Sequence, residues 1–396
     1  MSQDTPRSNR FHIGLFGRRN TGKSSLVNAL CGQQVAVVSD VPGTTTDVVL
    51  KNMELPGIGA AVLVDTAGFD DEGDLGLLRV EQTRKAAARV DLALMVVAAW
   101  PVADAPELEW ARSLSRQDTP VIWVCNCTDR VGQACAEAWH HLVGQQPVCV
   151  SARTGQGIDS LRQAMADVYR QGNEVMSLTA HLVHDRSLVV LVMPQDAQAP
   201  KGRLILPQVQ TLRELLDRHC IVVSCAPEEL PQTLTLLGRE PDCVITDSQV
   251  FAQVDRVLPA HVPLTSFSVL FARQKGDMAL FVCGAQAMMR LTGPARVLIA
   301  EACTHVPQHE DIGRVKLPHL LRTRLGQQLN IEVVSGNDFP DDVSAYDLVI
   351  HCGACMFTRR HVLNRVRVAR AAGVPVTNYG LAIAALTGIL ERITVR

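Results

Sequence analysis

The stretch GRRNTGKSS, residues 17–25, constrains the fold of this chain more than any other feature of its sequence. It follows the apolar segment FHIGLF (11–16) and precedes LVNALCG (26–32), whose apolar spacing and closing glycine predict a helix. Strand, glycine-rich loop and helix in this order are typical of a phosphate-binding loop. Backbone N–H groups there surround phosphates, Lys23 reaches the β- and γ-phosphates, and the Ser24 hydroxyl binds Mg2+. The pattern predicts an α/β domain with a parallel sheet.

Further nucleotide-binding segments follow at the expected places. AAVLVDTAG (60–68) is an apolar strand that ends in Asp65, which we expect to hold Mg2+ through water, while Gly68 senses the γ-phosphate. We expect Thr45 to be the switch threonine on Mg2+, with Thr44 as the alternative. Lys23, Thr45, Asp65 and Gly68 are therefore the predicted catalytic residues.

Residue Phe69 follows the DTAG segment, at the position where Ras-like proteins carry a glutamine that orients water. A phenyl ring forms no hydrogen bond to water, so we expect Mg2+-dependent hydrolysis to be slow.

Two later segments predict guanine recognition, and hence GTP as the nucleotide. VIWVCNCTD (121–129) is a buried strand followed by Asn126 and Asp129, and a carboxylate at this position accepts two hydrogens of the guanine edge. The backbone N–H of Ala152 is expected to donate to the guanine oxygen. Cys127 stands where such loops have a lysine that packs over the base, so affinity is expected to suffer more than specificity. The predicted nucleotide contacts are Gly17, Asn20, Thr21, Gly22, Lys23, Ser24, Ser25, Asn126, Asp129, Ser151 and Ala152.

Composition argues for a soluble globular chain without a nucleic-acid partner. The 396 residues include 38 Lys and Arg against 40 Asp and Glu, which leaves no basic excess for RNA or DNA. The N-terminus lacks an apolar signal core, and the longest apolar runs are too short to span a bilayer. We therefore expect a cytoplasmic protein whose 12 cysteines are free thiols or metal ligands.

The alternation of strands and helices predicts three α/β domains. We assign 1–170 to the nucleotide-binding domain, 171–183 to a linker, 184–264 to a small central domain and 265–396 to a C-terminal domain. The central domain shows no catalytic constellation, which favours a structural or interface role, and we find no internal repeat.

Two predicted strands in the C-terminal domain end in cysteine and histidine. Cys303 and His305 follow VLIAEA, and His351, Cys352 and Cys355 follow DLVI. Because ligands gather at the carboxyl ends of parallel strands, these residues predict a metal site. Three cysteines and a histidine suit tetrahedral zinc, whereas three cysteines with one open position suit a four-iron cluster. The spacing does not choose between the two metals.

The chain resembles two groups of known proteins at different scales. GRRNTGKSS followed by VSDVPGTTTD resembles the Era and TrmE group of GTPases, in which the asparagine matching Asn20 helps to bind a stimulating K+ ion. Across almost the whole length, APKGRLILPQVQT, LTSFSVLFAR, LIAEACTHVP, VIHCGACM and GVPVTNYG resemble blocks of the HydF family.

The HydF resemblance implies a GTPase domain, a dimerisation domain and a domain that carries a 4Fe-4S cluster. It implies a scaffold that receives the two-iron precursor of the FeFe-hydrogenase site from radical-SAM maturases and delivers it to apo-hydrogenase. Cys303, Cys352 and Cys355 match the cluster cysteines, and His305 and His351 match histidines near the fourth iron. The identity of the fourth ligand stays open. The alternative is an Era-like regulatory or ribosome-assembly GTPase with a structural zinc domain.

Overall fold

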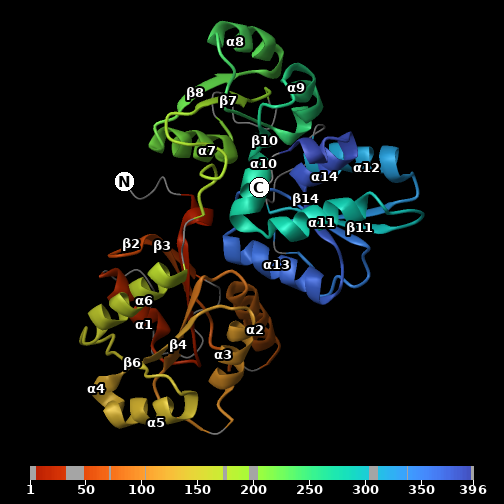
Figure 1. The fold of residues 1–396 in the computed structure, drawn as a ribbon. Helices are drawn as coiled ribbons and strands as arrows, with labels where there is room; N and C mark the ends of the chain where they lie inside the picture. Colours follow the sequence, from red (N-terminus) through yellow and green to blue (C-terminus); the bar gives the residue numbers. More distant parts are fainter. Residues whose placement is uncertain are drawn as a thin grey trace. The chain divides into compact units, whose positions relative to one another are not determined.

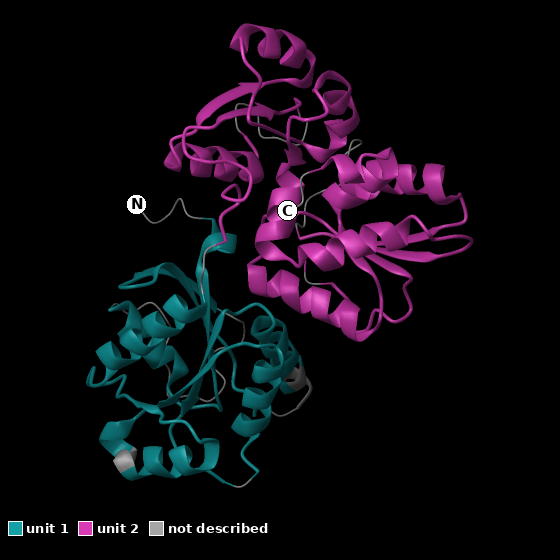
Figure 2. Cartoon of the chain, in the orientation of Figure 1, with its two compact units in different colours: residues 1–175 teal, residues 176–396 magenta. Residues whose placement is uncertain are grey.

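The computed structural model describes most of the chain, which divides into two compact units, residues 1–175 and 176–396 (Figure 2). The described residues are 6–32, 49–70, 73–102, 104–172, 176–195, 204–302, 311–336 and 338–393. Among them, no helix is long and apolar enough to cross a bilayer.

Unit 1 is built on a six-stranded sheet in the order β2-β3-β1-β4-β5-β6 (Figure 1). All pairs are parallel except β2 with β3 at one edge. Apolar side chains of α1 and α6 cover one face, and those of α2, α3 and α5 cover the other. The strands are β1 (Phe11–Phe16), β2 (Val49–Leu55), β3 (Gly59–Asp65), β4 (Leu92–Val97), β5 (Val121–Cys125) and β6 (Val148–Cys149). The helices are α1 (Lys23–Cys31), α2 (Gly73–Ala87), α3 (Pro106–Arg116), α4 (Thr128–Val131), α5 (Gln133–Val143) and α6 (Ile158–Gly172).

Unit 2 contains two four-stranded parallel sheets, which we call module A and module B. The sheet of module A has the order β10-β9-β7-β8, and that of module B has the order β12-β11-β13-β14. Module A comprises β7 (Leu188–Val192), α7 (Leu206–Asp217), β8 (Ile221–Cys225), α8 (Leu230–Leu237), β9 (Cys243–Thr246), α9 (Phe251–Val257), β10 (Leu264–Ser266) and α10 (Phe267–Lys275). Module B follows α11 (Met278–Met288) and comprises β11 (Arg296–Ala300), the π-helix η5 (Ile312–Lys316), α12 (Leu317–Leu325), β12 (Asn330–Val334), β13 (Leu348–His351), α13 (Arg359–Ala371), β14 (Val376–Asn378) and α14 (Tyr379–Thr387).

The two modules repeat one architecture, which corrects the expectation that the chain has no internal repeat. Counted along the chain, the strands of each sheet lie in the order 2-1-3-4. Their registers also agree: Val192 pairs with Thr246 in module A as Ala300 pairs with His351 in module B. The sequence carries a faint trace of this repeat, VPLTSFSV at 262–269 and VPVTNYGL at 374–381.

The contacts between the modules are reciprocal, as a pseudo-two-fold axis requires. In module A, Ser248 and Ser268 correspond to Gly353 and Gly380 of module B. A Cβ atom at Gly353 would lie 3.6 Å from Ser268 Oγ, and a Cβ atom at Gly380 would lie 3.2 Å from Ser248 Oγ. One apolar core runs through both modules. The carboxyl edges of the two sheets therefore meet at this axis.

The predicted domain boundaries can be placed on these elements. The division between the units at 175 falls inside the predicted linker. Leu178 and Val183, in the same linker, are buried against β7 and α10. The predicted boundary after 264 falls within β10, which belongs to the sheet of module A.

Candidate nucleotide site and cysteine loop

The glycine-rich loop connects β1 to α1 with the backbone that a phosphate loop needs. Gly17 has φ 154° and Gly22 has φ 83°, both in the region that favours glycine. A Cβ at Gly17 would lie 2.3 Å from the Val96 carbonyl oxygen, and one at Gly22 would lie 2.3 Å from Asn126 Nδ2. Any side chain at either position would displace the loop from the neighbouring strand ends.

Lys23, the first residue of α1, lies under this loop. Its side chain is buried, and its Nζ donates to the carbonyl oxygens of Gly17 at 2.9 Å and Arg18 at 2.7 Å. Thr21 Oγ1 also donates to Arg18 O at 3.0 Å. The ammonium is thus held at the centre of the loop, where it can meet phosphate oxygens.

Two of the residues predicted to bind Mg2+, Ser24 and Asp65, lie side by side. Ser24 Oγ donates to Asp65 Oδ2 at 2.8 Å, joining α1 to the end of β3. Burial raises the pKa of Asp65, while the Ser24 hydrogen bond and the Lys23 charge oppose that shift. Asp65 Oδ1 is buried and has no hydrogen-bond partner among the described residues. A hydroxyl beside a carboxylate with a spare buried oxygen fits a hydrated Mg2+ ion.

The region after β3 packs against the phosphate loop. A Cβ at Gly68 would lie 2.7 Å from the Arg19 backbone nitrogen, so only glycine fits there without a shift. Phe69 is buried and stacks on Trp110 with ring centroids 5.4 Å apart. Its ring therefore belongs to the core of unit 1. The predicted switch residue Thr45 and its alternative Thr44 lie outside the described residues.

Two further predicted phosphate contacts, Asn20 and Ser25, are more exposed than Lys23. Asn20 is exposed and has φ 59°, a left-handed conformation that asparagine tolerates better than most residues. Ser25 is half-buried in the first turn of α1.

Asn126 joins the two loops predicted to surround guanine. Its Nδ2 donates to Thr21 O at 2.9 Å, and its Oδ1 accepts from the Ala152 backbone N–H at 3.1 Å. The N–H group that we expect to reach guanine is thus already hydrogen-bonded within the protein. Asn126 is buried, so it ties the guanine loop to the phosphate loop.

Both carboxylate oxygens of Asp129 are also engaged. Ser151 Oγ donates to Oδ1 at 2.7 Å, and Arg153 Nη2 lies 2.6 Å from Oδ2. The Ser151 hydrogen bond and the Arg153 charge hold the pKa of Asp129 below its usual value. Arg153 is 75% exposed, so its ion pair with Asp129 is weak.

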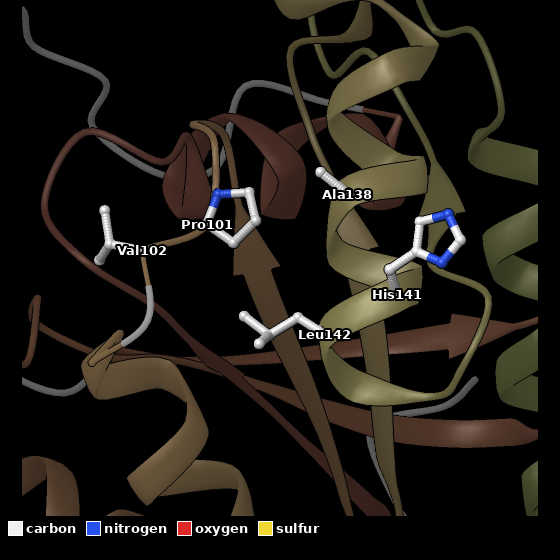
Figure 3. A pocket seen from close by; sticks show the side chains of 5 residues that line it. All are labelled: Pro101, Val102, Ala138, His141 and Leu142. Atoms are coloured by element: carbon white, nitrogen blue, oxygen red, sulfur yellow. The ribbon is translucent and has the colours of Figure 1, made fainter.

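Cys127 adopts a left-handed conformation, φ 60°, immediately before α4. Its Sγ would lie 4.0 Å from a Cβ at Gly22, so the thiol faces the phosphate loop. A pocket elsewhere in unit 1 is open and about 300 Å³ in volume (Figure 3). The pocket is lined by Pro101, Val102, Ala138, His141 and Leu142. None of these residues is a predicted nucleotide contact.

In module B, residues 352–358 connect β13 to α13, and we call this segment the cysteine loop. Cys352 is half-buried, and its Sγ accepts hydrogen bonds from the backbone N–H of Ala302 at 3.1 Å and of Ala354 at 3.4 Å. Burial raises the pKa of the Cys352 thiol to about 11. Backbone N–H groups that donate to a cysteine sulfur stabilise its thiolate and tune a cluster bound to it.

The other half of the predicted metal site lies outside the described residues. Cys303 and His305 fall there, although Cys303 directly follows Ala302, whose N–H meets Cys352 Sγ. Among the described ranges, no three histidines, cysteines or carboxylates are grouped as a metal site would require. The described residues thus supply two of the three predicted cysteines.

His351 uses both ring nitrogens within module B. Nδ1 lies 2.9 Å from Cys352 O, and Nε2 lies 3.2 Å from Arg365 Nη1. Because Arg365 can only donate, Nε2 is the acceptor and Nδ1 carries the proton. Burial lowers the pKa of His351 to about 3, and the Arg365 charge adds to that effect. In this arrangement the imidazole positions the cysteine loop.

Three buried charged residues around the cysteine loop escaped the sequence analysis. Arg365 of α13 also lies over the rings of Phe339 and Phe357. Glu301, which follows β11, accepts from Ser335 Oγ at 3.2 Å. Lys275 of α10 donates to carbonyl oxygens of the loop. The Lys275 contacts span about 80 residues and the Glu301–Ser335 contact spans 34, so no local pattern could have revealed them.

The loop of unit 1, with Lys23 beneath it and the Ser24–Asp65 pair beside it, defines a P-loop GTPase domain joined to two repeated α/β modules. Family comparisons agree with this class. The model of the 50S ribosome-binding GTPase matches residues 12–127. The hydrogen maturase F dimerization domain matches 178–276, and the hydrogen maturase F tetramerization domain matches 279–395. The latter two together cover more than half of the chain, which therefore belongs to the hydrogen maturase F (HydF) family.

Curated relatives are similar over the front of the chain. The tRNA modification GTPase MnmE of Laribacter hongkongensis is 35% identical over 39% of this chain and 34% of its own length. MnmE of Thermus thermophilus is 36% identical over 46% of this chain and 41% of its own length. The chain thus spans less than half the length of these relatives. The solved structure of Aquifex aeolicus Era bound to GDP.AlF4- has a TM-score of 0.37 and 18% identity, over 57% of this chain and 98% of that chain.

Proposed function

We propose that this chain is a GTP-hydrolysing scaffold for maturation of FeFe-hydrogenase. It binds GTP and Mg2+ in unit 1 and holds a 4Fe-4S cluster in module B. It receives the two-iron precursor from radical-SAM maturases and delivers it to apo-hydrogenase. The observation that carries this proposal is the match of residues 178–276 and 279–395 to the two HydF domains, combined with Cys352 and Cys355 after the carboxyl end of β13.

The donor set in module B fits an iron–sulfur cluster. Cys303, Cys352 and Cys355 would hold it, and the N–H groups of Ala302 and Ala354 would stabilise the Cys352 thiolate. A four-iron cluster held by three thiolates supplies one iron open to exchange. His351, hydrogen-bonded through both nitrogens, would orient the loop and leave that iron to another ligand.

In unit 1, Lys23 and the Ser24–Asp65 pair would bind the phosphates and Mg2+. Turnover would be slow, because the Phe69 ring is packed on Trp110 in the core and forms no hydrogen bond to water. Lys23→Ala should lose most GTP hydrolysis while its iron content stays at the wild-type level. Hydrolysis at the wild-type rate would show that this loop is not the site.

Asn20 supports the further proposal that K+ stimulates hydrolysis. Its exposed side chain lies within the phosphate loop, between Gly17 and Gly22, where a monovalent cation could add positive charge near the phosphates. We expect faster turnover in KCl than in NaCl at equal ionic strength, and no such difference in Asn20→Ala. Equal wild-type rates in both salts would exclude this role.

Module A would pair two chains in the cytoplasm, in line with the dimerization model that matches it. Its edge strand β8 exposes Ile221 (59%), an apolar side chain that an interface could cover. Sedimentation of the full chain would give the oligomeric state. A monomer at high concentration would contradict the homodimer.

The cluster itself is tested by iron, sulfide and zinc analysis of protein purified without oxygen, followed by activation of apo-hydrogenase in vitro. About four irons and four sulfides per chain are expected. The match of residues 12–127 to a ribosome-binding GTPase favours one rival, a ribosome-assembly GTPase with structural zinc. One zinc per chain without sulfide would support that rival and exclude the scaffold.

A further inference from the structure

The cysteine loop of module B is held by a lysine from module A. Lys275 is the last residue of α10 and is only 4% exposed. Its Nζ donates to the carbonyl oxygens of Ala354 at 3.0 Å, Cys355 at 3.3 Å and Phe357 at 2.7 Å. All three hydrogens of the ammonium are thus directed at the turn that carries Cys355.

The charge of Lys275 has no carboxylate partner among the described residues. Its contacts there are the three carbonyl oxygens and the Phe271 ring, whose centroid lies 5.3 Å away. Removing an ammonium from water is costly, and carbonyl dipoles compensate only part of that cost. A buried cation beside Cys352 and Cys355 therefore suits an anionic group bound by these sulfurs.

Lys275 has no cationic counterpart at the equivalent position of the repeat, the end of α14. By the register of the two sheets, Lys275 at the end of α10 corresponds to Thr387 at the end of α14. Thr387 Oγ1 donates only within its own helix, to Ile383 O at 2.8 Å and Ala384 O at 3.2 Å. The segment after β9 of module A thus receives no counterpart of Lys275 from α14; the lysine that reaches it from module B is Lys316, which donates to a side chain, Gln249 Oε1, at 2.9 Å.

We propose that Lys275 is a positioning residue for the iron–sulfur site, which fixes the cysteine loop and balances the negative charge of the thiolate-bound cluster. The inference rests on the proposed cluster in module B. It makes modules A and B one functional unit, because module A supplies a second buried cation beside the Arg365 that module B itself provides. A nearby positive charge favours the reduced, more negative cluster.

The test compares Lys275→Met, Lys275→Gln and Lys275→Arg in the full chain, each reconstituted with iron and sulfide without oxygen. Both neutral variants should lower the reduction potential of the cluster, followed by electron paramagnetic resonance during a redox titration. They should also release iron to a chelator about tenfold faster, as expected for the loss of hydrogen bonds from a charged donor. Lys275→Arg should stay near the wild type in potential.

Lys85→Met is the matched control, since it removes an exposed lysine of α2 in unit 1. Circular dichroism of the apo-proteins and GTP hydrolysis check the fold, and Lys275→Gln serves if Lys275→Met is misfolded. Neutral variants that match Lys85→Met in potential and iron release would overturn the inference. A wild-type chain that binds no cluster would instead overturn the proposed function, so the two failures are distinguishable.

Discussion

Modules A and B share a scaffold but differ in the residues placed at one edge of their sheets. After β9 of module A come Asp247 and Ser248, and after β13 of module B come Cys352 and Gly353. The strand order, the registers and the capping residues at the start of α10 and α14 are otherwise alike. The comparison teaches that the parallel sheet fixes where a site can lie, while a few residues after the strands decide its chemistry.

The largest expected difference concerns iron. Cys352→Ser should lose most iron, because two remaining thiolates are too few to retain a cuboidal cluster. Cys225→Ser changes a half-buried cysteine at the same edge of module A and should keep the wild-type iron content. Iron and sulfide analysis measures both, and hydrogenase activation should fail only in the first. A Cys352→Ser protein that keeps its iron and still activates hydrogenase would remove the distinction between the modules.

How much of this could be predicted from sequence differs between the two units. The P-loop is a local pattern, so Lys23 and Ser24 were predicted from residues adjacent to them, and the α/β class with a P-loop domain is confirmed. The neighbouring position of Asp65 followed from the parallel sheet. The ion pair between Asp129 and Arg153 was not predicted, because it depends on how two loops meet.

In unit 2 the limiting factor was distance along the chain. Lys275 contacts carbonyl groups about 80 residues away, and Arg365 contacts Glu301 O across 64 residues. Such pairs depend on the packing of the two modules, which no single segment encodes. The repeat itself left a usable signal, because DCVIT (242–246) and DLVIH (347–351) align as the two VPxT segments do. Comparing the halves of the sequence with each other would have found it.

A second comparison concerns an aspartate that both modules share, and here we expect the two modules to respond alike. Asp242 Oδ2 accepts the backbone N–H of Leu188, and Asp347 Oδ2 accepts that of Arg296, both at 2.7 Å. Each bond ties the start of the first strand to the third. We expect Asp242→Ala and Asp347→Ala each to cost about 1 kcal/mol of local stability, or about fivefold faster hydrogen exchange.

Exchange at the first amides of β7 and β11, followed by mass spectrometry, measures this effect separately in each module. The Asp242 carboxylate also pairs with Arg239 at the surface, which adds little. Arg239→Ala is therefore a suitable control. If only one of the two aspartate variants exchanged faster, the modules would not share this device, and the repeat would be limited to strand order.

The smallest expected effect tests the pseudo-two-fold contact between the modules. At Gly380 a Cβ would lie 2.9 Å from Val269 Cγ2, whereas at Gly353, the glycine of the reciprocal contact, it would lie no closer than 3.6 Å to Ser268 Oγ. Valine is branched at Cβ and cannot turn away cheaply, so Gly380→Ala should destabilise unit 2 by about 1 kcal/mol. Gly353→Ala should stay within about 0.5 kcal/mol of the wild type, although it alters the cysteine loop.

Thermal unfolding of the apo-proteins, monitored by circular dichroism, compares the two. Equal stability of the two variants would mean that the interface relaxes around the added methyl group. The contact at Gly380 would then contribute no more to the packing of the modules than the contact at Gly353.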